Sequence, residues 1–485
     1  MVAPLVGVIL AAGRGVRAYP YTRTIPKSML EVDGVPLIER NVVLMRDRLK
    51  IEDVRIVIGH HGDVISEHLG DGSRLGVRIT YVKNDRLDLE MAYSAYLGTR
   101  GLSAPCCVIL GDECYVDTDH EVLLSPEVQS AFGACGLVDA HYAKHVRKNY
   151  TVTLSGNRIT DIIEKPAVVS GNEMGTGTYF LSPALVLRLA RAFEGDPERG
   201  PRDFMGFLAE LCRKGENIVA FRLKGSYVNV NSRDDLNYGN YLVRELTMDR
   251  KKASLVYVVD GEEDRAARPV EVFAARPDLD EVVVVTRRVS PPLAEVSKNP
   301  KVRLLALPES TPIGALFTSG LDAATGDVLL LSYSDDTFSP RDVAKLLVYL
   351  RDADLVVGTR TTRQMIEQGT NMRGLVRAAH LALAKVLEML WWRFECRFTD
   401  VCCVYRGIWR STYRTIRQNL TATGVEIIPE MVIEVLRARR RVVEIPVNYY
   451  NRDLEYPWVR SRYQNAGTFL RILALMLRKR FGSPA

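Results

Sequence analysis

The sequence has no apolar stretch long enough to cross a membrane. Its most apolar segments, residues 381–392 and 469–477, are short and carry charged residues, whereas a spanning helix needs about 20 apolar residues in a row. The first residues also lack the pattern of a signal peptide, because the apolar run 2–10 leads directly into glycines. We therefore expect a cytoplasmic protein whose only membrane role is peripheral contact at the inner face.

Metal-binding and nucleic-acid-binding patterns are also lacking. The eight cysteines form no C-x-x-C pair, and several lie in apolar runs such as PCCVIL, which favours buried free thiols and no zinc site. The net charge of +6, from 65 basic and 59 acidic residues, is small for 485 residues. It suits anionic substrates, and without a DNA- or RNA-reading motif no nucleic-acid partner is expected.

What the chain does contain is an alternation of strand-like and helix-like segments that occurs twice. Such alternation predicts α/β domains, each with a mostly parallel sheet flanked by helices. We predict two tandem Rossmann-like (GT-A-like) domains at residues 1–243 and 254–485, with a charged connector at 244–253. Each half has an apolar strand that ends in an acidic turn, which is consistent with two distant copies of one nucleotide-binding architecture.

The first strand leads into a loop that suits a chain of phosphates. The loop, LAAGRGVR at residues 10–17, is followed by the pair Pro26-Lys27. Glycines let backbone N–H groups approach phosphate oxygens, and Arg17 and Lys27 are placed to neutralise charge on the α-phosphate and the leaving pyrophosphate. The loop residues expected to bind the nucleotide with these two cations are Leu10, Ala11, Ala12, Gly13 and Gly15.

Together with PLIER at residues 36–40, this motif resembles the signature of nucleotidyltransferases that activate sugar and alcohol phosphates. The resemblance extends over residues 5–240 and implies a reaction that depends on Mg²⁺ or Mn²⁺ and releases pyrophosphate from a nucleoside triphosphate. By this resemblance Arg17, Lys27 and Asp112 are catalytic, and Asp112 and Asn231 are metal ligands. The acceptor-side residues that it implies are Glu164, Lys165 and Gly175.

Residues 82–98, VKNDRLDLEMAYSAYLG, bear on the choice of substrate. They resemble a segment of cytidylyltransferases that act on phosphocholine, inositol phosphate or phosphonates, and differ from the "Q-P-x-G-T-A" region of sugar-specific members. The prediction is CTP with a small phosphorylated alcohol, sugar or phosphonate, and Asn84 at the substrate. The alternative is a sugar 1-phosphate uridylyl- or thymidylyltransferase.

The second half resembles inverting family-two glycosyltransferases, above all the dolichol-phosphate mannose synthase type. The resemblance rests on residues 310–347, on DLVVGTR and FTDVCCVYRG, and on the tail 427–452. It implies transfer of a group from a nucleotide-linked donor to a polyprenyl-phosphate or another phosphate-bearing acceptor. The implied residues are Asp335 and Asp336 for the metal, Asp336 and Asp400 for catalysis, and Glu262, Arg360, Arg406 and Arg452 for the substrates.

Two departures from that pattern leave a second hypothesis open. Ser334 stands where the first carboxylate of a D-x-D pair is expected, and VVTRRVS at residues 284–290 replaces an acidic segment that recognises the base. The second half is therefore either a transferase with a different donor or a non-catalytic binding or scaffold module. The basic amphipathic helix at 468–481 is either an interfacial helix for a lipid-linked acceptor or a packing helix.

Overall fold

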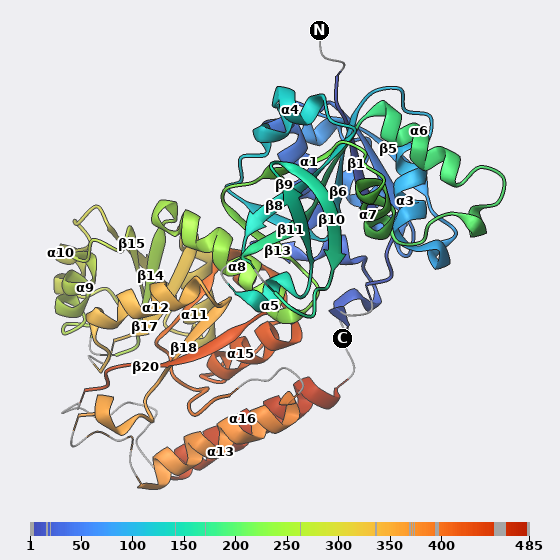
Figure 1. Cartoon of the computed structure of the whole chain (residues 1–485). Coiled ribbons are helices and arrows are strands. Elements are labelled where there is room, and N and C mark those ends of the chain that lie inside the picture. The colour runs from blue at the N-terminus through green and yellow to red at the C-terminus, as the bar shows by residue number, and fades with distance from the viewer. Residues whose placement is uncertain are drawn as a thin grey trace. The chain divides into compact units, whose positions relative to one another are not determined.

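A computed structural model of the 485-residue chain divides into two compact units, Met1–Val243 and Arg244–Ala485 (Figure 1). Both are α/β units with mostly parallel sheets, which confirms the predicted fold class. The residues that the structure describes are 4–15, 18–19, 21–140, 142–169, 171–261, 263–334, 337–367, 370, 372, 374–392, 397–450 and 462–482.

The first unit is built on a nine-stranded sheet in the order β5-β4-β1-β6-β11-β8-β12-β10-β9. The strands β5, β4, β1 and β6 are parallel, and β11 is antiparallel to both of its neighbours. The bounds are β1 (Val6–Ala11), β4 (Asp53–Ile58), β5 (Arg78–Lys83), β6 (Cys106–Leu110), β8 (Gly133–Asp139), β9 (Tyr150–Ser155), β10 (Arg158–Glu164), β11 (Glu173–Leu181) and β12 (Ile218–Arg222).

Helices cover both faces of this sheet (Figure 1), and a hydrophobic core lies on each face. One core contains residues of α1 and α2, and the other contains residues of α3, α6 and α7. The helix bounds are α1 (Leu37–Leu49), α2 (Gly62–Leu69), α3 (Glu90–Thr99), α4 (Pro126–Gln129), α5 (Ala143–Val146), α6 (Pro183–Ala192), α7 (Phe204–Arg213) and α8 (Arg233–Thr247).

Two short antiparallel pairs stand beside the main sheet. One joins β2 (Glu31–Val32) to β3 (Val35–Pro36). The other joins β7 (Glu113–Val116) to β13 (Ser226–Asn229), with Glu113 opposite Asn229. The second pair, here called the β7–β13 ribbon, brings two distant parts of the sequence together next to the end of β6.

The second unit has a seven-stranded sheet in the order β16-β15-β14-β17-β19-β18-β20, with β19 antiparallel to its neighbours. The strands are β14 (Ala253–Val259), β15 (Glu281–Thr286), β16 (Val302–Ala306), β17 (Val328–Tyr333), β18 (Leu355–Thr359), β19 (Arg406–Trp409) and β20 (Val442–Pro446). The helices are α9 (Ala267–Ala274), α10 (Pro291–Val296), α11 (Ile313–Ala323), α12 (Val343–Leu350), α13 (Gly374–Leu390), α14 (Arg410–Ile416), α15 (Ile427–Arg437) and α16 (Arg462–Phe481).

The segment expected to be a charged connector is largely regular structure. It contains the end of α8, a 3-10 turn at Met248–Arg250 and the first residue of β14. Arg244 is buried, forms a 2.7 Å ion pair with Asp354 and lies over the ring of Trp409. This arginine therefore belongs to the packed interior of the second unit.

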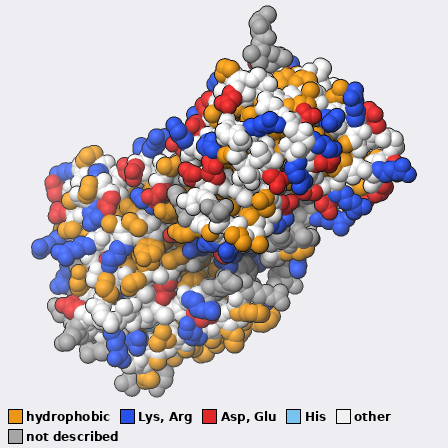
Figure 2. Space-filling view, in the orientation of Figure 1, with side chains coloured by type: hydrophobic (Ala, Val, Ile, Leu, Met, Phe, Trp, Pro, Cys, Tyr) orange, Lys and Arg blue, Asp and Glu red, His pale blue; other side chains and the backbone are white. Residues whose placement is uncertain are grey.

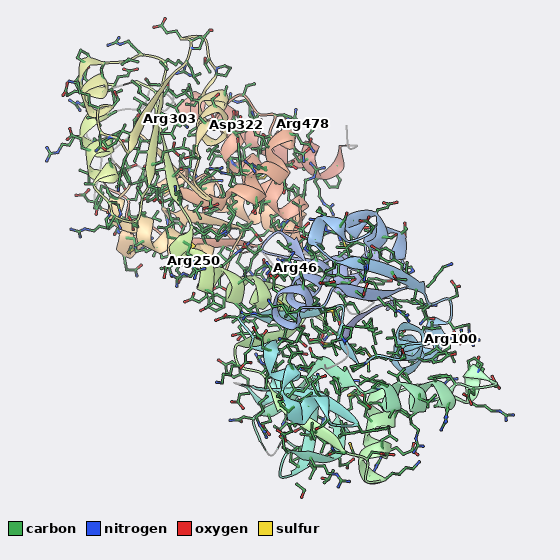
Figure 3. All side chains as sticks on the ribbon, turned by 90° about the horizontal axis from the view of Figure 1, so that it is seen from above. Arg46, Arg100, Arg250, Arg303, Asp322 and Arg478 are labelled. Atoms are coloured by element: carbon green, nitrogen blue, oxygen red, sulfur yellow. The ribbon has the colours of Figure 1, made fainter. Side chains whose placement is uncertain are left out.

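Charged side chains such as Arg100 in the first unit and Arg303 and Asp322 in the second are exposed, as Figure 3 shows. Among the described residues, no helix combines the length and the apolar character needed to cross a membrane.

Candidate functional site

The first unit has a cavity of about 790 Å³ at the carboxyl ends of β1 and β6. The glycine loop forms one part of its wall, and residues from β10, β11 and the β7–β13 ribbon form others. Twelve of the predicted site residues line it: Leu10, Ala11, Ala12, Gly13, Gly15, Lys27, Asn84, Asp112, Glu164, Lys165, Gly175 and Asn231. Arg17, predicted to be catalytic, lies outside the described residues.

Lys27, Asp112 and Asn231 are in direct contact at this cavity. The Lys27 ammonium forms an ion pair with a carboxylate oxygen of Asp112 and donates a 2.7 Å hydrogen bond to Oδ1 of Asn231. The Lys27 side chain is 11% exposed and that of Asp112 is 25% exposed. A carboxylate and an amide oxygen therefore face one cation, which is the donor set that Mg²⁺ prefers.

A network of hydrogen bonds fixes Asn231 in this position. Its side-chain amide donates a 2.5 Å bond to Oδ1 of Asn229, and its backbone N–H donates to the carboxylate of Asp235. The same carboxylate accepts from Ser232 and forms an ion pair with Lys148. Because Asn229 and Asp235 hold the predicted metal ligand, its amide oxygen stays directed at Lys27.

Two glycines of β11 leave space for neighbouring side chains at the cavity. A side chain on Gly175 would overlap the ring of Tyr150, and one on Gly177 would overlap the carboxyl of Glu113. At the end of β10, Glu164 and Lys165 form an ion pair with each other. Lys165 has a φ of 46°, a conformation that is uncommon for a residue with a side chain and that clusters at functional sites.

Asn84 lines the cavity but is committed to the structure of its own loop. Its side-chain amide donates a 2.9 Å hydrogen bond to Ser94, and its oxygen accepts from the backbone N–H of Arg86. The side chain is almost fully buried. Asn84 therefore stabilises the loop that leads into α3. Glu90, the first residue of α3, has a φ of 56° and also lines the cavity.

Glu113, which sequence reasoning missed, lies fully buried beside Asp112. Burial, and then the neighbouring charge of Asp112, raise the pKa of Glu113 well above its usual value. The buried carboxyl of Glu113 is thus harder to ionise than that of an exposed glutamate.

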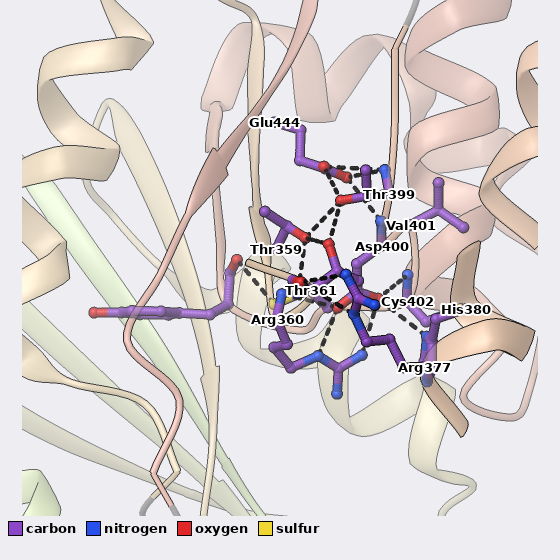
Figure 4. Close-up of polar contacts among 12 residues, drawn as sticks. Thr359, Arg360, Thr361, Arg377, His380, Thr399, Asp400, Val401, Cys402 and Glu444 are labelled. Atoms are coloured by element: carbon purple, nitrogen blue, oxygen red, sulfur yellow. Dashed lines mark hydrogen bonds and ion pairs between the residues drawn. The ribbon is translucent and has the colours of Figure 1, made fainter. Parts of the chain in front are cut away.

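In the second unit, a buried carboxylate gathers cationic side chains at the end of β18 (Figure 4). Arg360 donates to both oxygens of Asp400, at 2.7 and 3.0 Å, and Nδ1 of His380 lies 3.1 Å from Asp400. Burial opposes ionisation of Asp400, but the charges of Arg360 and His380 outweigh it and hold the pKa of Asp400 well below its usual range. Asp400 therefore holds the two cations at the end of β18.

His380 is the second residue that sequence reasoning missed. Burial lowers the pKa of His380, but the charge of Asp400 outweighs this effect and raises it to about 9. The imidazole is therefore protonated at pH 7 and adds to the positive charge of Arg360. A single histidine within an apolar helical pattern, as in α13, gave no signal of this role.

Arg406, predicted to bind the substrates, lies instead in the interior of the second unit. Arg406 is fully buried, and its guanidinium donates hydrogen bonds to the backbone carbonyls of Val401, Cys403 and Ile428. Burial lowers its pKa to about 10. The side chain joins two backbone segments, residues 401–403 and the start of α15, and is buried away from solvent.

Asp260, which directly follows β14, is paired with an arginine from residues 284–290, the segment that departs from the family pattern. Arg287, at the end of β15, forms an ion pair with Asp260 and donates to the carbonyl of Thr311. Both line a smaller cavity of about 360 Å³ together with Arg471 of α16. The other predicted residues of this site, Glu262, Asp335, Asp336 and Arg452, lie outside the described residues.

An α/β sheet with a glycine loop, a lysine and metal-type ligands at its strand ends defines the first unit as a transferase that handles nucleotides. Comparison with known proteins identifies the families. Residues 6–241 match the family model of nucleotidyl transferases, and residues 251–414 match that of glycosyl transferase family 2. The chain therefore joins a nucleotidyl transferase domain to a glycosyl transferase family 2 domain.

Individual relatives cover about half of the chain or less. A UTP--glucose-1-phosphate uridylyltransferase of Haloferax volcanii is 28% identical over 240 residues, which are 50% of this chain and 97% of that protein. An N-acetylmuramate alpha-1-phosphate uridylyltransferase of Neisseria meningitidis is 34% identical over 141 residues, 29% of this chain and 56% of that protein. The solved inositol-1-phosphate CTP transferase of T. maritima is 20% identical, with a TM-score of 0.42, and the match covers 51% of this chain and 98% of that one.

Proposed function

We propose that the first unit transfers a nucleotidyl group from a nucleoside triphosphate to a small phosphorylated sugar or alcohol and releases pyrophosphate. The observation that carries this proposal is the contact of Lys27 with Asp112 and Asn231 on the wall that also contains the glycine loop. Cation, metal ligands and backbone N–H groups thus converge where a triphosphate needs them.

Asp112 and Asn231 are the residues that would hold a divalent cation, which, when bound, neutralises charge on the phosphates. No group of three or more His, Cys, Asp or Glu side chains suited to a metal occurs in the part of the chain that the structure describes. Oxygens of the triphosphate would supply the remaining ligands, as is usual for Mg²⁺. Lys27 stabilises the leaving pyrophosphate, and Lys165 attracts the acceptor phosphate.

For the nucleotide, CTP is the first candidate, because residues 82–98 have the pattern described above. UTP or a thymidine triphosphate is the second candidate, and it is supported by the names of the relatives, which include uridylyl- and thymidylyltransferases. The test incubates the full-length protein and Mg²⁺ with each triphosphate and a panel of hexose 1-phosphates, inositol 1-phosphate, phosphocholine and phosphonates. Pyrophosphate release from CTP above all others is expected, and a clear preference for UTP or dTTP would establish the second candidate.

For the second unit, we propose transfer of a group from a nucleotide-linked donor to a phosphate-bearing acceptor such as a polyprenyl phosphate. Arg360, held on Asp400 with its side chain 14% exposed, supports binding of a phosphate. Asp335 and Asp336 are the proposed metal ligands, with Glu262 and Arg452 at the substrates. A non-catalytic binding module is the alternative, and the ion pair of Asp260 with Arg287 favours it because it occupies a strand-end carboxylate.

The two possibilities differ in the release of nucleotide. The purified product of the first reaction is supplied with a polyprenyl phosphate to the wild type and to Asp336→Ala. Nucleotide release in the wild type that is lost in the variant is the expected result. Equal release in both across a broad acceptor panel would establish the binding module.

The helices α13 and α16 lie side by side and expose apolar side chains, seen in the lower part of Figure 2. On α16 the basic residues Arg471 and Lys479 form ion pairs with glutamates at or near α15, so that α16 is a packing helix on one face. The strongly exposed apolar residues are Leu375, Met389 and Trp392 at α13 and Leu470 and Phe481 on α16. We propose that this apolar face, with Arg478 and Arg480 nearby, contacts the surface of a membrane that holds the lipid acceptor.

A further inference from the structure

Glu90, the first residue of α3, has a backbone conformation that is unusual for a residue with a side chain. Its φ of 56° and ψ of −152° lie at the edge of a region that is occupied almost only by glycine. Such a conformation persists only where the surrounding structure enforces it, and it is concentrated at functional sites. Glycine would adopt it without strain, so that a glutamate at this position points to a use for the side chain.

Hydrogen bonds of the loop before α3 hold Glu90 in this conformation. The side-chain amide of Asn84 donates to the hydroxyl of Ser94, and this hydroxyl donates to the backbone carbonyl of Glu90 at 3.4 Å. The side-chain oxygen of Asn84 accepts from the backbone N–H of Arg86. The polar groups of Asn84 and Ser94, which both line the cavity, are thus used within the protein.

The carboxylate of Glu90 is not used in this way. Glu90 is exposed and lines the cavity, and its carboxylate has no hydrogen-bond or ion-pair partner among the described residues. Leu87 and Met91, which line the cavity beside it, are apolar and half-buried. This part of the cavity, here called the α3 wall (Leu87, Glu90 and Met91), therefore combines two apolar side chains with one group that only accepts hydrogen bonds.

The α3 wall lies next to the glycine loop. A side chain added at Gly59 would come within 2.6 Å of the backbone oxygen of Ala12 and within 2.8 Å of the side chain of Leu87. Ala12 of the glycine loop and Leu87 of the α3 wall are therefore neighbours across one backbone position.

This location suits the base of the nucleoside triphosphate. The triphosphate is proposed to lie at the glycine loop and Lys27, and the acceptor phosphate is proposed to lie at Lys165. The nucleobase is the part of the two substrates that remains for the α3 wall. A base has flat faces that pack on apolar side chains and an edge that carries hydrogen-bonding groups, which matches the composition of this wall.

We propose that Glu90 selects the base of the triphosphate by accepting a hydrogen bond from an exocyclic amino group. The inference rests on the proposed function of the first unit and deepens it, because it names a residue that decides between the candidate triphosphates. Cytosine has an amino group where uracil and thymine have a carbonyl oxygen. A carboxylate accepts a hydrogen bond from the amino group, whereas it repels the carbonyl oxygen.

The first experiment titrates the full-length protein with CTP and with UTP in the presence of Mg²⁺ and measures the Kd of each. The two triphosphates differ only along one edge of the base, and no acceptor is required. We expect the wild type to bind CTP on the order of 10- to 100-fold more tightly than UTP. Tighter binding of UTP would overturn the proposal.

Glu90→Gln tests the role of the carboxylate directly. The amide keeps one acceptor and gains a donor, so that it can form a hydrogen bond with either base. E90Q is expected to lower the ratio of the two Kd values about 10-fold or more, chiefly through tighter binding of UTP. Glu67→Gln is the matched control, because Glu67 is an exposed residue of α2 that is not among the residues lining the cavity. E67Q should keep the wild-type ratio, and an unchanged ratio in E90Q would contradict the proposal.

Glu90→Gly separates recognition of the base from a role in the fold. Because glycine adopts the observed φ and ψ without strain, E90G is expected to raise the thermal midpoint by about 2 to 4 °C and to lose the preference for CTP. Glu67→Gly is the control, since glycine within a helix is unfavourable and should lower the midpoint. A lower midpoint in E90G with an unchanged ratio of Kd values would show that Glu90 serves only the fold.

The failure of this inference can be told apart from failure of the proposed function. If the wild type releases pyrophosphate from a triphosphate while E90Q keeps the wild-type ratio of Kd values, only the role of Glu90 is overturned. If no triphosphate binds and none yields pyrophosphate with any acceptor, the proposed function is overturned, and the selection of the base by Glu90 with it.

Discussion

Strand for strand, β5-β4-β1-β6-β11-β8-β12 of the first unit corresponds in position and direction to β16-β15-β14-β17-β19-β18-β20 of the second. In both, the fifth strand of this order is antiparallel, and the last two are parallel to each other. In each unit the sixth strand of this order comes before the fifth in the sequence. The units differ in the segment of chain that joins these two strands. In the first unit this segment forms the hairpin β9–β10, and in the second it forms the helix α13.

This difference falls on the acceptor side of each proposed site. The hairpin brings Tyr150 and Lys165 to the cavity of the first unit. The helix brings His380 to Asp400 and exposes an apolar face. One framework thus supports the cavity proposed for a small phosphorylated molecule in one copy and the apolar face proposed to contact a membrane in the other.

The donor sides differ as well. After β1 the first unit has an open glycine loop, whereas after β14 the second has Asp260 paired with Arg287. A shared strand order therefore positions the strand ends, and the residues at those ends decide the chemistry.

The largest expected effect concerns the first unit. Lys27→Ala removes the cation proposed to stabilise the leaving pyrophosphate, and Asp112→Ala removes a proposed metal ligand. Each should cost about 3 kcal/mol, or roughly 100-fold in rate, or more. Pyrophosphate release measures the loss. Lys214→Ala and Asp53→Ala are the matched controls, because both residues form exposed ion pairs away from the cavity. Near-normal turnover in K27A or D112A would contradict the assignment of the donor side.

The next prediction tests whether the units are stabilised separately. Arg244→Ala leaves the carboxylate of Asp354 buried without its 2.7 Å partner, which typically costs about 3 kcal/mol or more of unfolding free energy. Denaturant unfolding is expected to show a destabilised second unit, while pyrophosphate release remains. Lys298→Ala, which breaks an exposed pair with Glu295, is the control and should change stability by less than about 1 kcal/mol. A parallel loss of nucleotidyl transfer in R244A would contradict the separation.

The third prediction uses the protonated histidine at the strand ends of the second unit. His380 has a pKa of about 9 in the folded state, above the value of about 6.5 expected when unfolded. Its contribution is therefore complete below pH 6.5 and is lost as the pH rises towards 9. We expect the unfolding free energy of the second unit to fall by about 3 kcal/mol over this range.

Denaturant titrations at pH 6, 7.5 and 9 measure this decline. His380→Gln should flatten it, whereas His68→Gln, at an exposed pair in the first unit, should leave it unchanged. An equal slope in the wild type and H380Q would show that the charge of His380 contributes nothing to stability.

The smallest effect is expected from removing the second unit. A chain that ends after Arg250 keeps the cavity residues and the whole of α8. Its rate of pyrophosphate release should equal that of the full chain within about twofold, because the donor and acceptor residues of the first reaction are all retained. A large fall in rate would indicate that the second unit contributes to the first site.

The residues that the sequence singled out in the first unit line one cavity, and several of them follow a local rule. The glycine loop and Asp112 both come directly after apolar strands, and the carboxyl ends of parallel strands meet at one edge of a sheet. Lys27 and Asn231 came from a resemblance to a family, and the structure brings both of them to Asp112.

Other features depend on packing that no local pattern reveals. Arg406 matched a family motif, yet whether an arginine faces a substrate or three backbone carbonyls is decided by burial. Glu113 followed Asp112 unnoticed, because its orientation depends on the pairing of β7 with β13. Arg287 was recognised as a departure from the pattern, but its ion pair with Asp260 requires the two strands to be neighbours in space.

The β7–β13 ribbon also determines how early the site of the first unit can form during synthesis of the protein. Lys27 and Asn231 are 204 positions apart, and Asp235, which fixes Asn231, follows a few residues later. A nascent chain can form the glycine loop and the parallel strands long before these residues leave the ribosome. The charged site is assembled only when nearly all of the first unit has been translated, so that the first pyrophosphate released by a growing chain would report that this unit has finished folding.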